Sequence, residues 1–123
     1  MLKSKIHRAT VTQADVHYQG SLTLDTHLLH AGDIVPYEEV HVWNVTRGTR
    51  FRTYAMTGEI GSGVVCANGA AALLVSPGDL IIIATFTMLE EAELEGFKPK
   101  LVFVDAANRI TSVKTEELAG PTY

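Results

Sequence analysis

Apolar and polar residues alternate in short segments along the chain, and this period of two predicts β-strands. The stretch 5–18 (KIHRATVTQADVHY) alternates and is rich in β-branched residues, so it predicts one or two strands. EVHVWNV and RFRTYAM predict a hairpin over 39–56 with Gly48 in its turn. Further strands are expected at 64–68, 79–88, 100–105 and 110–113. About seven short strands with frequent turn signals predict a small closed β-barrel.

Helical patterns are confined to short segments. After Asp25, a suitable N-cap, Leu28 and Leu29 share one face, and Gly32 provides a stop, which predicts a short helix. The small residues of NGAAALLV (68–75) favour one helical turn, and EEAELEGF (90–97) predicts a short polar helix or a loop. The tail 114–123 is expected to be frayed. The sequence therefore predicts one mainly β domain, residues 1–123, with short helices.

Composition narrows the class of protein. With 123 residues, 46% of them hydrophobic and 20% charged, the chain is expected to be globular rather than disordered. A net charge of −4 without a basic cluster argues against nucleic acid as a partner. The single cysteine, Cys66, cannot form an internal disulfide; it is interpreted as a buried apolar residue and suits a reducing compartment. Without a signal-peptide pattern or an apolar run long enough to span a membrane, a soluble cytoplasmic protein is expected.

A Gly-Ser pair, Gly20-Ser21, interrupts the segment DVHYQGSLTLD, which otherwise has the pattern of a strand on both sides. A serine hydroxyl held against the preceding carbonyl can attack it and convert the peptide into an ester. Elimination from the ester would cut the chain and leave a dehydroalanine, which hydrolyses to a pyruvoyl group. Glycine tolerates the strained backbone that this attack requires. The alternative is an ordinary turn, and a flexible loop is expected for the second pair, Gly61-Ser62.

Two further segments could bind a carboxylate. In RFRTYAM, Arg50, Arg52 and Tyr54 share one face of the predicted strand, which would provide guanidinium groups and a phenolic proton donor. The alternative is a solvated strand face. The segment NGAAA could present backbone N–H groups at a helix start, although a close-packed turn explains it equally well.

No metal site is expected. The five histidines form no recognised ligand pattern, and the chain lacks HExxH.

Taken together, four segments closely resemble the pyruvoyl-dependent aspartate 1-decarboxylase family in order and spacing: KIHRATVTQADVHYQGSLTLD, WNVTRGTRFRTYA, VVCANGAAA and PGDLIIIA. The resemblance extends from Lys3 to about Ala84 and weakens in the last third. It implies a closed six-stranded double-psi β-barrel, in a homotetramer whose active sites lie between subunits. It also implies decarboxylation of L-aspartate to β-alanine for pantothenate, and hence coenzyme A, biosynthesis.

The resemblance also implies roles for individual residues. The chain would cleave itself between Gly20 and Ser21 into 1–20 and 21–123, and Ser21 would become a covalently bound pyruvoyl group that forms a Schiff base with the substrate amine. Tyr54 would return a proton after CO2 leaves. Thr53 would assist processing and bind substrate, together with the backbone of Gly69, Ala70 and Ala71 and the side chain of Arg50. Residues expected to line or support the site are Lys5, His7, Tyr18, Trp43 and Asn68.

Two alternatives stay open at this point. The chain could be a non-enzymatic barrel that binds a carboxylate ligand or a partner protein and never cleaves itself. The mechanism could also act on a neighbouring substrate such as glutamate. Whether maturation is spontaneous or requires a helper protein is not readable from the residues.

Overall fold

The computed structural model describes residues 1–118 and contains one mainly β domain with three short helices among them. Strands and helices follow one another in the order β1 (Leu2–Thr10), β2 (Gln13–Asp15), β3 (Leu22–Asp25), α1 (Thr26–Ala31), β4 (Glu39–Asn44), β5 (Arg50–Gly58), β6 (Val65–Asn68), η1 (Gly69–Leu73), β7 (Leu80–Phe86), η2 (Glu91–Glu93), β8 (Lys100–Val104) and β9 (Ile110–Lys114). The mainly β class predicted from the alternation is confirmed.

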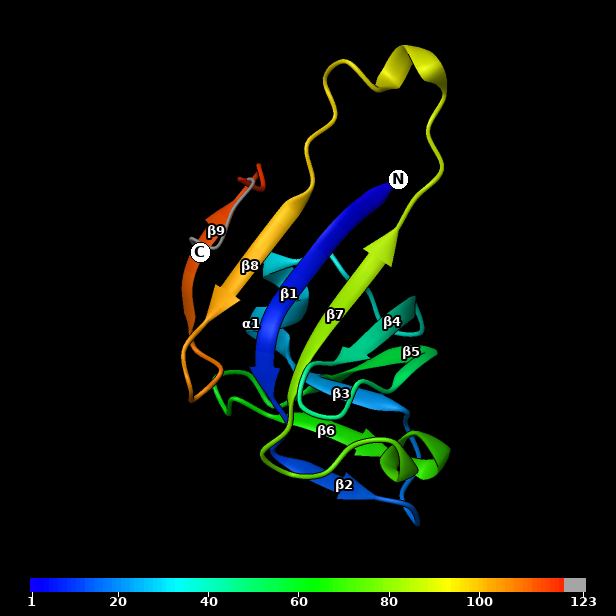
Figure 1. Ribbon diagram of the computed structural model, residues 1–123, viewed down its shortest axis with the longest axis vertical. Coiled ribbons are helices and arrows are strands. Elements are labelled where there is room, and N and C mark those ends of the chain that lie inside the picture. Colours follow the sequence, from blue (N-terminus) through cyan, green and yellow to red (C-terminus); the bar gives the residue numbers. More distant parts are fainter. Residues whose placement is uncertain (119–123) are drawn as a thin grey trace.

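The strands form one nine-stranded sheet in the order β2-β6-β3-β5-β4-β7-β1-β8-β9 (Figure 1). Within residues 1–118 its end strands, β2 and β9, do not pair with each other, so the expected closed ring of six strands is not found. Parallel pairs, β1 with β8, β2 with β6 and β3 with β5, join strands that are distant in sequence. Alternation within a strand carries no information on such pairings, so the sequence alone could not specify the order of the strands in the sheet.

Local signals placed the hairpin and the first helix correctly. β4 and β5 pair antiparallel, with Trp43 opposite Arg50, and Gly48 in the turn has a φ of 79°. The side chain of Asp25 accepts a hydrogen bond from the backbone N–H of His27 and caps α1, which ends at Ala31 with Gly32 as its C-cap. Both features depend on residues close in sequence, so the sequence was sufficient to predict them.

The segment before Ser21 differs from the prediction. β2 ends at Asp15, whose carboxylate accepts a hydrogen bond from the backbone N–H of His17 at 2.9 Å. This side-chain turn diverts the backbone from a strand, and Val16–Ser21 therefore forms a loop. The Gly20-Ser21 pair is thus flanked by a strand only on its C-terminal side.

Other boundaries also shifted. β7 ends at Phe86, and Leu80 and Ile82 are only half-buried, so this strand is less buried than its apolar run suggested. The connection 87–99 extends beyond the sheet as an arm that carries η2 (Figure 1). At the C-terminus, β9 includes Lys114, which was expected in the frayed tail; residues 119–123 of that tail lie outside the described part.

The hydrophobic core lies between the sheet strands and α1. Its fully buried members include Ile6 of β1, Leu24 of β3, Leu28 of α1, Val42 of β4 and Ile83 of β7. Cys66 is buried at 6% exposure, as predicted. This core fixes β3, β5 and β6 beside one another, and the segment containing Ser21 enters the sheet there.

Candidate active site

Gly20 adopts a backbone conformation that favours glycine. Its φ is +86°, in the left-handed region where a side chain is strained. A Cβ built on Gly20 would meet Met56 Cγ at 3.5 Å, which is ordinary contact. The requirement for glycine therefore comes from the backbone conformation and not from crowding.

Ser21 is half-buried and held by two neighbouring strands. Its hydroxyl is hydrogen-bonded to the hydroxyl of Thr53 on β5. Its carbonyl oxygen accepts a hydrogen bond of 2.8 Å from the backbone N–H of Asn68, at the end of β6. The parallel pairing of β3 with β5, which sets Leu22 opposite Ala55, places Ser21 and Thr53 together. Ser21 is therefore a positioned hydroxyl rather than part of a flexible turn.

Two cavities are lined by Ser21. The larger, of about 390 Å³, is also lined by Tyr18, Gln19, Gly20, Tyr54, Asn68, Gly69 and Ala70. The smaller, of about 200 Å³, is lined by Ser21 together with Phe51, Arg52, Thr53, Ala70, Ala71 and Leu74. The structure thus brings together most of the predicted site: Tyr18, Gly20, Ser21, Thr53, Tyr54, Asn68, Gly69, Ala70 and Ala71.

Tyr54 lies in the wall of the larger cavity and is 39% exposed. Its ring stacks on Tyr37, with 6.0 Å between ring centroids and 25° between planes. The backbone N–H of Tyr37 donates to the carbonyl of Ala55 at 2.8 Å, which anchors the stacking ring. Tyr37 therefore supports the phenol. The sequence analysis missed it because Tyr37 precedes β4 and no local pattern pairs it with Tyr54.

Residues 68–70 line the same cavity as Tyr54, and Ala70 and Ala71 line the smaller one. Gly69 has a φ of +63°, again a conformation suited to glycine, and η1 begins there. The first N–H groups of a helix have no acceptor within it, so this backbone can donate to a bound anion. The predicted helical turn is confirmed as a 3-10 helix.

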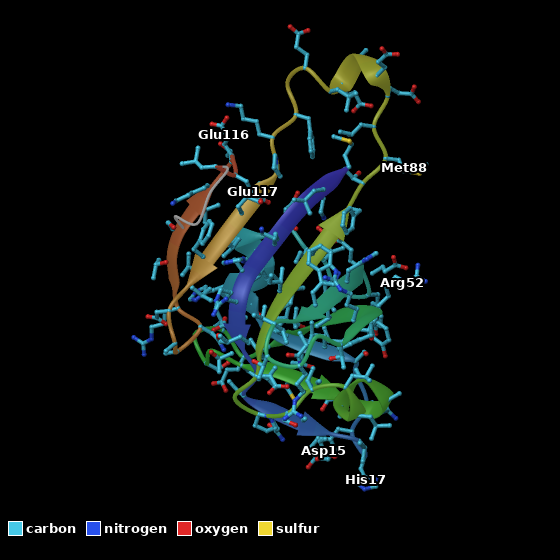
Figure 2. The ribbon with its side chains drawn as sticks, in the orientation of Figure 1. Asp15, His17, Arg52, Met88, Glu116 and Glu117 are labelled. Carbon is cyan, nitrogen blue, oxygen red and sulfur yellow. The ribbon has the colours of Figure 1, made fainter. Side chains whose placement is uncertain are left out.

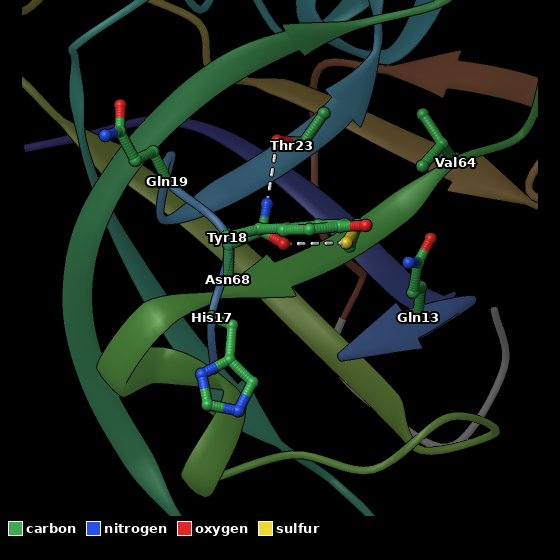
Figure 3. Close-up of a pocket in the computed structure, with 8 residues that line it drawn as sticks. Gln13, His17, Tyr18, Gln19, Thr23, Val64 and Asn68 are labelled. Atoms are coloured by element: carbon green, nitrogen blue, oxygen red, sulfur yellow. Dashed lines mark hydrogen bonds between the residues drawn. The ribbon is translucent and has the colours of Figure 1, made fainter. Parts of the chain in front are cut away.

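The Asn68 side chain is buried and tied to neighbouring polar groups. Its Nδ2 donates to Thr23 Oγ1 at 3.4 Å, and its Oδ1 accepts from the thiol of Cys66 at 3.3 Å (Figure 3). These residues line a third cavity of about 500 Å³ that shares Tyr18, Gln19 and Asn68 with the larger Ser21 cavity. Burial raises the pKa of the Cys66 thiol, which keeps it protonated as a donor.

Four predicted residues do not line either Ser21 cavity: Lys5, His7, Trp43 and Arg50. The Arg50 guanidinium lies 5.5 Å from the Trp43 ring centroid, in a cation–π contact on the β4–β5 hairpin. Lys5 and His7 lie on β1, three strands from β5 in the sheet. Resemblance alone could not show this separation, because it aligns positions in sequence without giving the distances between them.

The two β1 residues have their own surroundings. Lys5 Nζ forms an ion pair with Glu117 at 3.1 Å, and the His7 ring packs on Phe103 with 5.5 Å between centroids. Burial lowers the pKa of His7; the positive charges of Lys5 and Arg8 lower it further, whereas Glu117 raises it. His7 is therefore held mainly neutral at physiological pH.

Among residues 1–118, no group of three or more His, Cys, Asp or Glu side chains is arranged to hold a metal ion. None of the helices within that range is long and apolar enough to cross a membrane.

Comparison with known proteins gives consistent matches. The aspartate decarboxylase family model matches residues 1–111. The aspartate 1-decarboxylase of Myxococcus xanthus is 60% identical over 121 residues, covering 98% of this chain and 93% of the relative. The enzymes of the same name from Chromobacterium violaceum and Legionella pneumophila (strain Lens) are 60% and 58% identical, covering 93% and 96% of this chain and 90% and 89% of their own lengths.

A solved structure is similar in fold. It is the crystal structure of a rationally designed protein, mkDPBB_sym_86, which matches 66% of this chain and 95% of its own length with a TM-score of 0.50 and 16% identity. This likeness concerns the fold alone, and it is of the double-psi β-barrel type. The family match extends over most of the chain and includes every residue around Ser21. The chain therefore belongs to the aspartate decarboxylase family.

Proposed function

We propose that this chain cleaves itself between Gly20 and Ser21, converts Ser21 into a pyruvoyl group and uses it to decarboxylate L-aspartate. As a family member the chain is a lyase, and the reaction yields β-alanine and CO2 for pantothenate biosynthesis. The observation that carries the residue-level proposal is the Ser21 hydroxyl. This hydroxyl is hydrogen-bonded to the hydroxyl of Thr53. Ser21 itself comes directly after a glycine with a positive φ and lines two cavities.

Cleavage would proceed in balanced steps. Ser21 Oγ bonds to the carbonyl carbon of Gly20, the peptide C–N bond breaks, and the former amide nitrogen becomes a free amine. Loss of the Ser21 α-proton then breaks the Cβ–O bond, releasing 1–20 with a carboxylate and leaving dehydroalanine at position 21. Water replaces the amine, which departs as ammonia, and a ketone remains on 21–123.

Neighbouring groups support this chemistry. Thr53 is hydrogen-bonded to the attacking hydroxyl and can accept or relay its proton. The backbone N–H of Asn68 holds the Ser21 carbonyl, which fixes the residue while its side chain reacts. The left-handed backbone of Gly20 is open to glycine without strain, and it leaves the Gly20 carbonyl without a neighbouring Cβ that would hinder the attack.

In the mature enzyme, the pyruvoyl ketone would condense with the substrate amine and act as the electron sink for CO2 loss, as other carbonyl cofactors do. The N–H groups of the Gly69–Ala71 backbone are placed to hold the substrate beside it. Tyr54 lines the larger cavity, and its stacking on Tyr37 fixes the phenol there. We therefore assign Tyr54 as the group that donates a proton to the α-carbon.

The four residues outside these cavities suggest a shared site. We propose that Lys5, His7, Trp43 and Arg50 complete the site of a neighbouring copy in a homotetramer, working in the cytoplasm. Their placement on β1 and at the end of the β4–β5 hairpin supports this arrangement. A maturation helper protein is compatible with the exposed loop 16–19 beside the cleavage point.

Intact mass of the purified chain under denaturing conditions tests the proposal. Processing predicts two species, 1–20 and 21–123, with the larger one lighter by one ammonia than a fragment that begins with serine. A single species near 13.4 kDa, unchanged after incubation at higher temperature, would instead support the non-enzymatic barrel. Turnover of L-aspartate and L-glutamate, measured side by side on the processed protein, then tests the substrate.

A further inference from the structure

Tyr37 has a backbone conformation that core packing does not explain. Its φ is +71°, in the left-handed region that is unfavourable for a bulky side chain. The residue is 74% exposed, so burial of its ring does not compensate for this conformation. Its one ring contact within residues 1–118 is the stacking on Tyr54. A strained residue is kept only where its surroundings enforce it, and such residues are common at functional sites.

The loop 33–38, which joins α1 to β4, is braced by the Glu38 carboxylate. Oε1 of Glu38 accepts a hydrogen bond from the backbone N–H of Val35 at 3.0 Å, and Oε2 pairs with Lys3 Nζ of β1 at 2.6 Å. The same ammonium group donates to the carbonyl of Asp33 at 2.6 Å. The charged side chains of the pair are only 21% and 20% exposed, so solvent screens their attraction only in part. One ion pair therefore fixes both ends of the loop.

The braced loop is attached to β5 directly beside Tyr54. The backbone N–H of Tyr37 donates to the Ala55 carbonyl at 2.8 Å, and the Ala55 N–H donates to the Glu38 carbonyl at 3.0 Å. These bonds fix the backbone of the loop against residue 55, and the stacked rings join the side chains of Tyr37 and Tyr54. Because a tyrosine side chain can otherwise rotate about its two side-chain torsions, the stacking restricts where the Tyr54 hydroxyl lies.

The chemistry of the reaction makes the position of this hydroxyl important. Loss of CO2 leaves an electron pair shared between the substrate α-carbon and the former Cα of Ser21, so either carbon can take the proton. Protonation of the α-carbon, followed by addition of water, gives β-alanine and restores the ketone. Protonation at residue 21, followed by addition of water, leaves the nitrogen there as an alanine and releases 3-oxopropanoate. In that case the ketone is reduced, the substrate amine carbon is oxidised, and the site is lost.

We propose that the loop 33–38, braced by the Lys3–Glu38 ion pair, is a positioning element that holds Tyr54 so that the proton reaches the substrate α-carbon. Tyr37 and Glu38 act through Tyr54, since no residue of the loop lines either Ser21 cavity. The inference rests on the proposed function, because it takes Tyr54 as the proton donor. It adds that a loop outside the cavities determines how many turnovers one site completes.

Four variants test the inference: Tyr37→Ala removes the stacked ring, Tyr37→Phe keeps it, Glu38→Ala removes the brace, and Glu116→Ala is the exposed control. Figure 2 shows Glu116 beyond the end of β9, on the opposite side of the molecule from Arg52 of β5. After intact mass has confirmed cleavage, kcat, KM and the number of turnovers before activity stops are measured with L-aspartate. The mass of 21–123 then reports alanine formation, since one oxygen atom is exchanged for one nitrogen and three hydrogen atoms.

We expect Tyr37→Ala to lower the number of turnovers per site roughly tenfold, the effect of losing one aromatic pair. Alanine at residue 21 should accumulate correspondingly faster, kcat should fall by a smaller factor, and the aspartate KM should change little. Glu38→Ala should fall between Tyr37→Ala and the wild type, because the backbone bonds to Ala55 remain. Tyr37→Phe and Glu116→Ala should match the wild type.

An unchanged ratio of alanine to β-alanine in Tyr37→Ala would overturn the inference, even if this variant were less stable or slower to cleave. If Tyr37→Ala does not fold or cleave, Glu38→Ala, which keeps both rings, decides in the same way.

A second measurement does not depend on activity. In the Ser21→Ala chain, the nuclear Overhauser contact between the rings of Tyr37 and Tyr54 should weaken when Glu38→Ala is added. An unchanged contact would overturn the inference whether or not the chain is active. Failure of the proposed function is distinguishable, since it would show as an uncleaved wild type or as absence of aspartate turnover.

Discussion

Ser21 and Asp25 border the two ends of β3, four residues apart, and their surroundings differ sharply. The Asp25 carboxylate is 3% exposed and accepts hydrogen bonds from three backbone N–H groups, those of His27, Gly61 and Gly63, at 2.8–3.0 Å. The Ser21 hydroxyl has one hydroxyl partner, Thr53, and lies between two cavities. The Asp25 end of β3 is therefore saturated with hydrogen bonds and has a structural role. The Ser21 end is open, because its hydroxyl remains accessible for a reaction.

Asp79, the residue before β7, repeats the structural pattern. It is 4% exposed and accepts hydrogen bonds from Asn44 Nδ2, the Ser76 backbone N–H and Arg47 Nε at 2.8–2.9 Å. Buried carboxylates that each accept three hydrogen bonds from the protein are poorly placed to bind a substrate, but they fix loops and turns. A polar group that can still form hydrogen bonds and that lies beside a cavity is the better indication of an active site in this molecule.

The largest effect is expected at the open end of β3. Ser21→Ala should leave one uncut chain without decarboxylase activity, because alanine has no hydroxyl to attack the Gly20 carbonyl. Intact mass and aspartate turnover measure both results. The matched control is Ser62→Ala in the second Gly-Ser pair, whose hydroxyl donates to the Glu59 carbonyl at 2.6 Å and accepts from the Val64 N–H at 3.2 Å; it should cleave normally. Cleavage in Ser21→Ala would refute the assignment of the nucleophile.

Tyr54→Phe should separate processing from catalysis. The phenyl ring keeps the stacking on Tyr37, so cleavage should be normal, while kcat should fall roughly a hundred- to ten-thousandfold because the proton donor is lost. Tyr37→Phe is the control, since it retains the stacked ring and changes a hydroxyl on the supporting residue. Unchanged turnover in Tyr54→Phe would exclude the proton-donor role.

At the saturated end of β3, Asp25→Asn should lower the free energy of unfolding by about 2 kcal/mol, because an amide offers one acceptor oxygen and leaves buried N–H groups unpaired. Urea unfolding in the uncut Ser21→Ala background, at one protein concentration, measures this without a contribution from chain cleavage. Glu59→Gln, an exposed carboxylate change near the same loop, should have little effect. Equal stabilities would show that the Asp25 contacts do not stabilise the fold.

The same variant should change the response to acid. Burial raises the pKa of Asp25, but hydrogen bonds from Gly63, His27 and Gly61 outweigh it and hold the pKa below its ordinary value. The stability it contributes is therefore present above pH about 4 and is lost as the pH falls through the lower folded-state pKa. Asp25→Asn should be less sensitive to acid in this range than the wild type.

The smallest effect is expected far from both ends of β3, at the Lys5–Glu117 pair. Glu117 is 48% exposed on its side chain, so Glu117→Gln should cost less than about 1 kcal/mol of stability. Because the negative charge of Glu117 raises the pKa of His7, its removal should lower that pKa further. NMR titration of the His7 ring measures the shift, with Glu116→Gln as the neighbouring control. A His7 pKa that does not move would show that Glu117 does not act on it in solution.

Local residue patterns were sufficient for several parts of this protein. The β4–β5 hairpin, the Asp25 cap of α1 and the turn at Gly69 each depend on residues within a few positions, so their physical cause is contained in a short segment. Similarity of whole motifs to a known family supplied the activity and pointed to Ser21.

Contacts between distant segments were decided only by the tertiary structure. The parallel pairing of β3 with β5 brings Thr53 to Ser21, and the chain reversal before β4 brings Tyr37 to Tyr54. Alternation placed Arg50, Arg52 and Tyr54 on one face but could not show which arginine meets the Ser21 cavity. A two-residue period specifies only the face of a strand, whereas its neighbours depend on long-range packing that no short segment encodes.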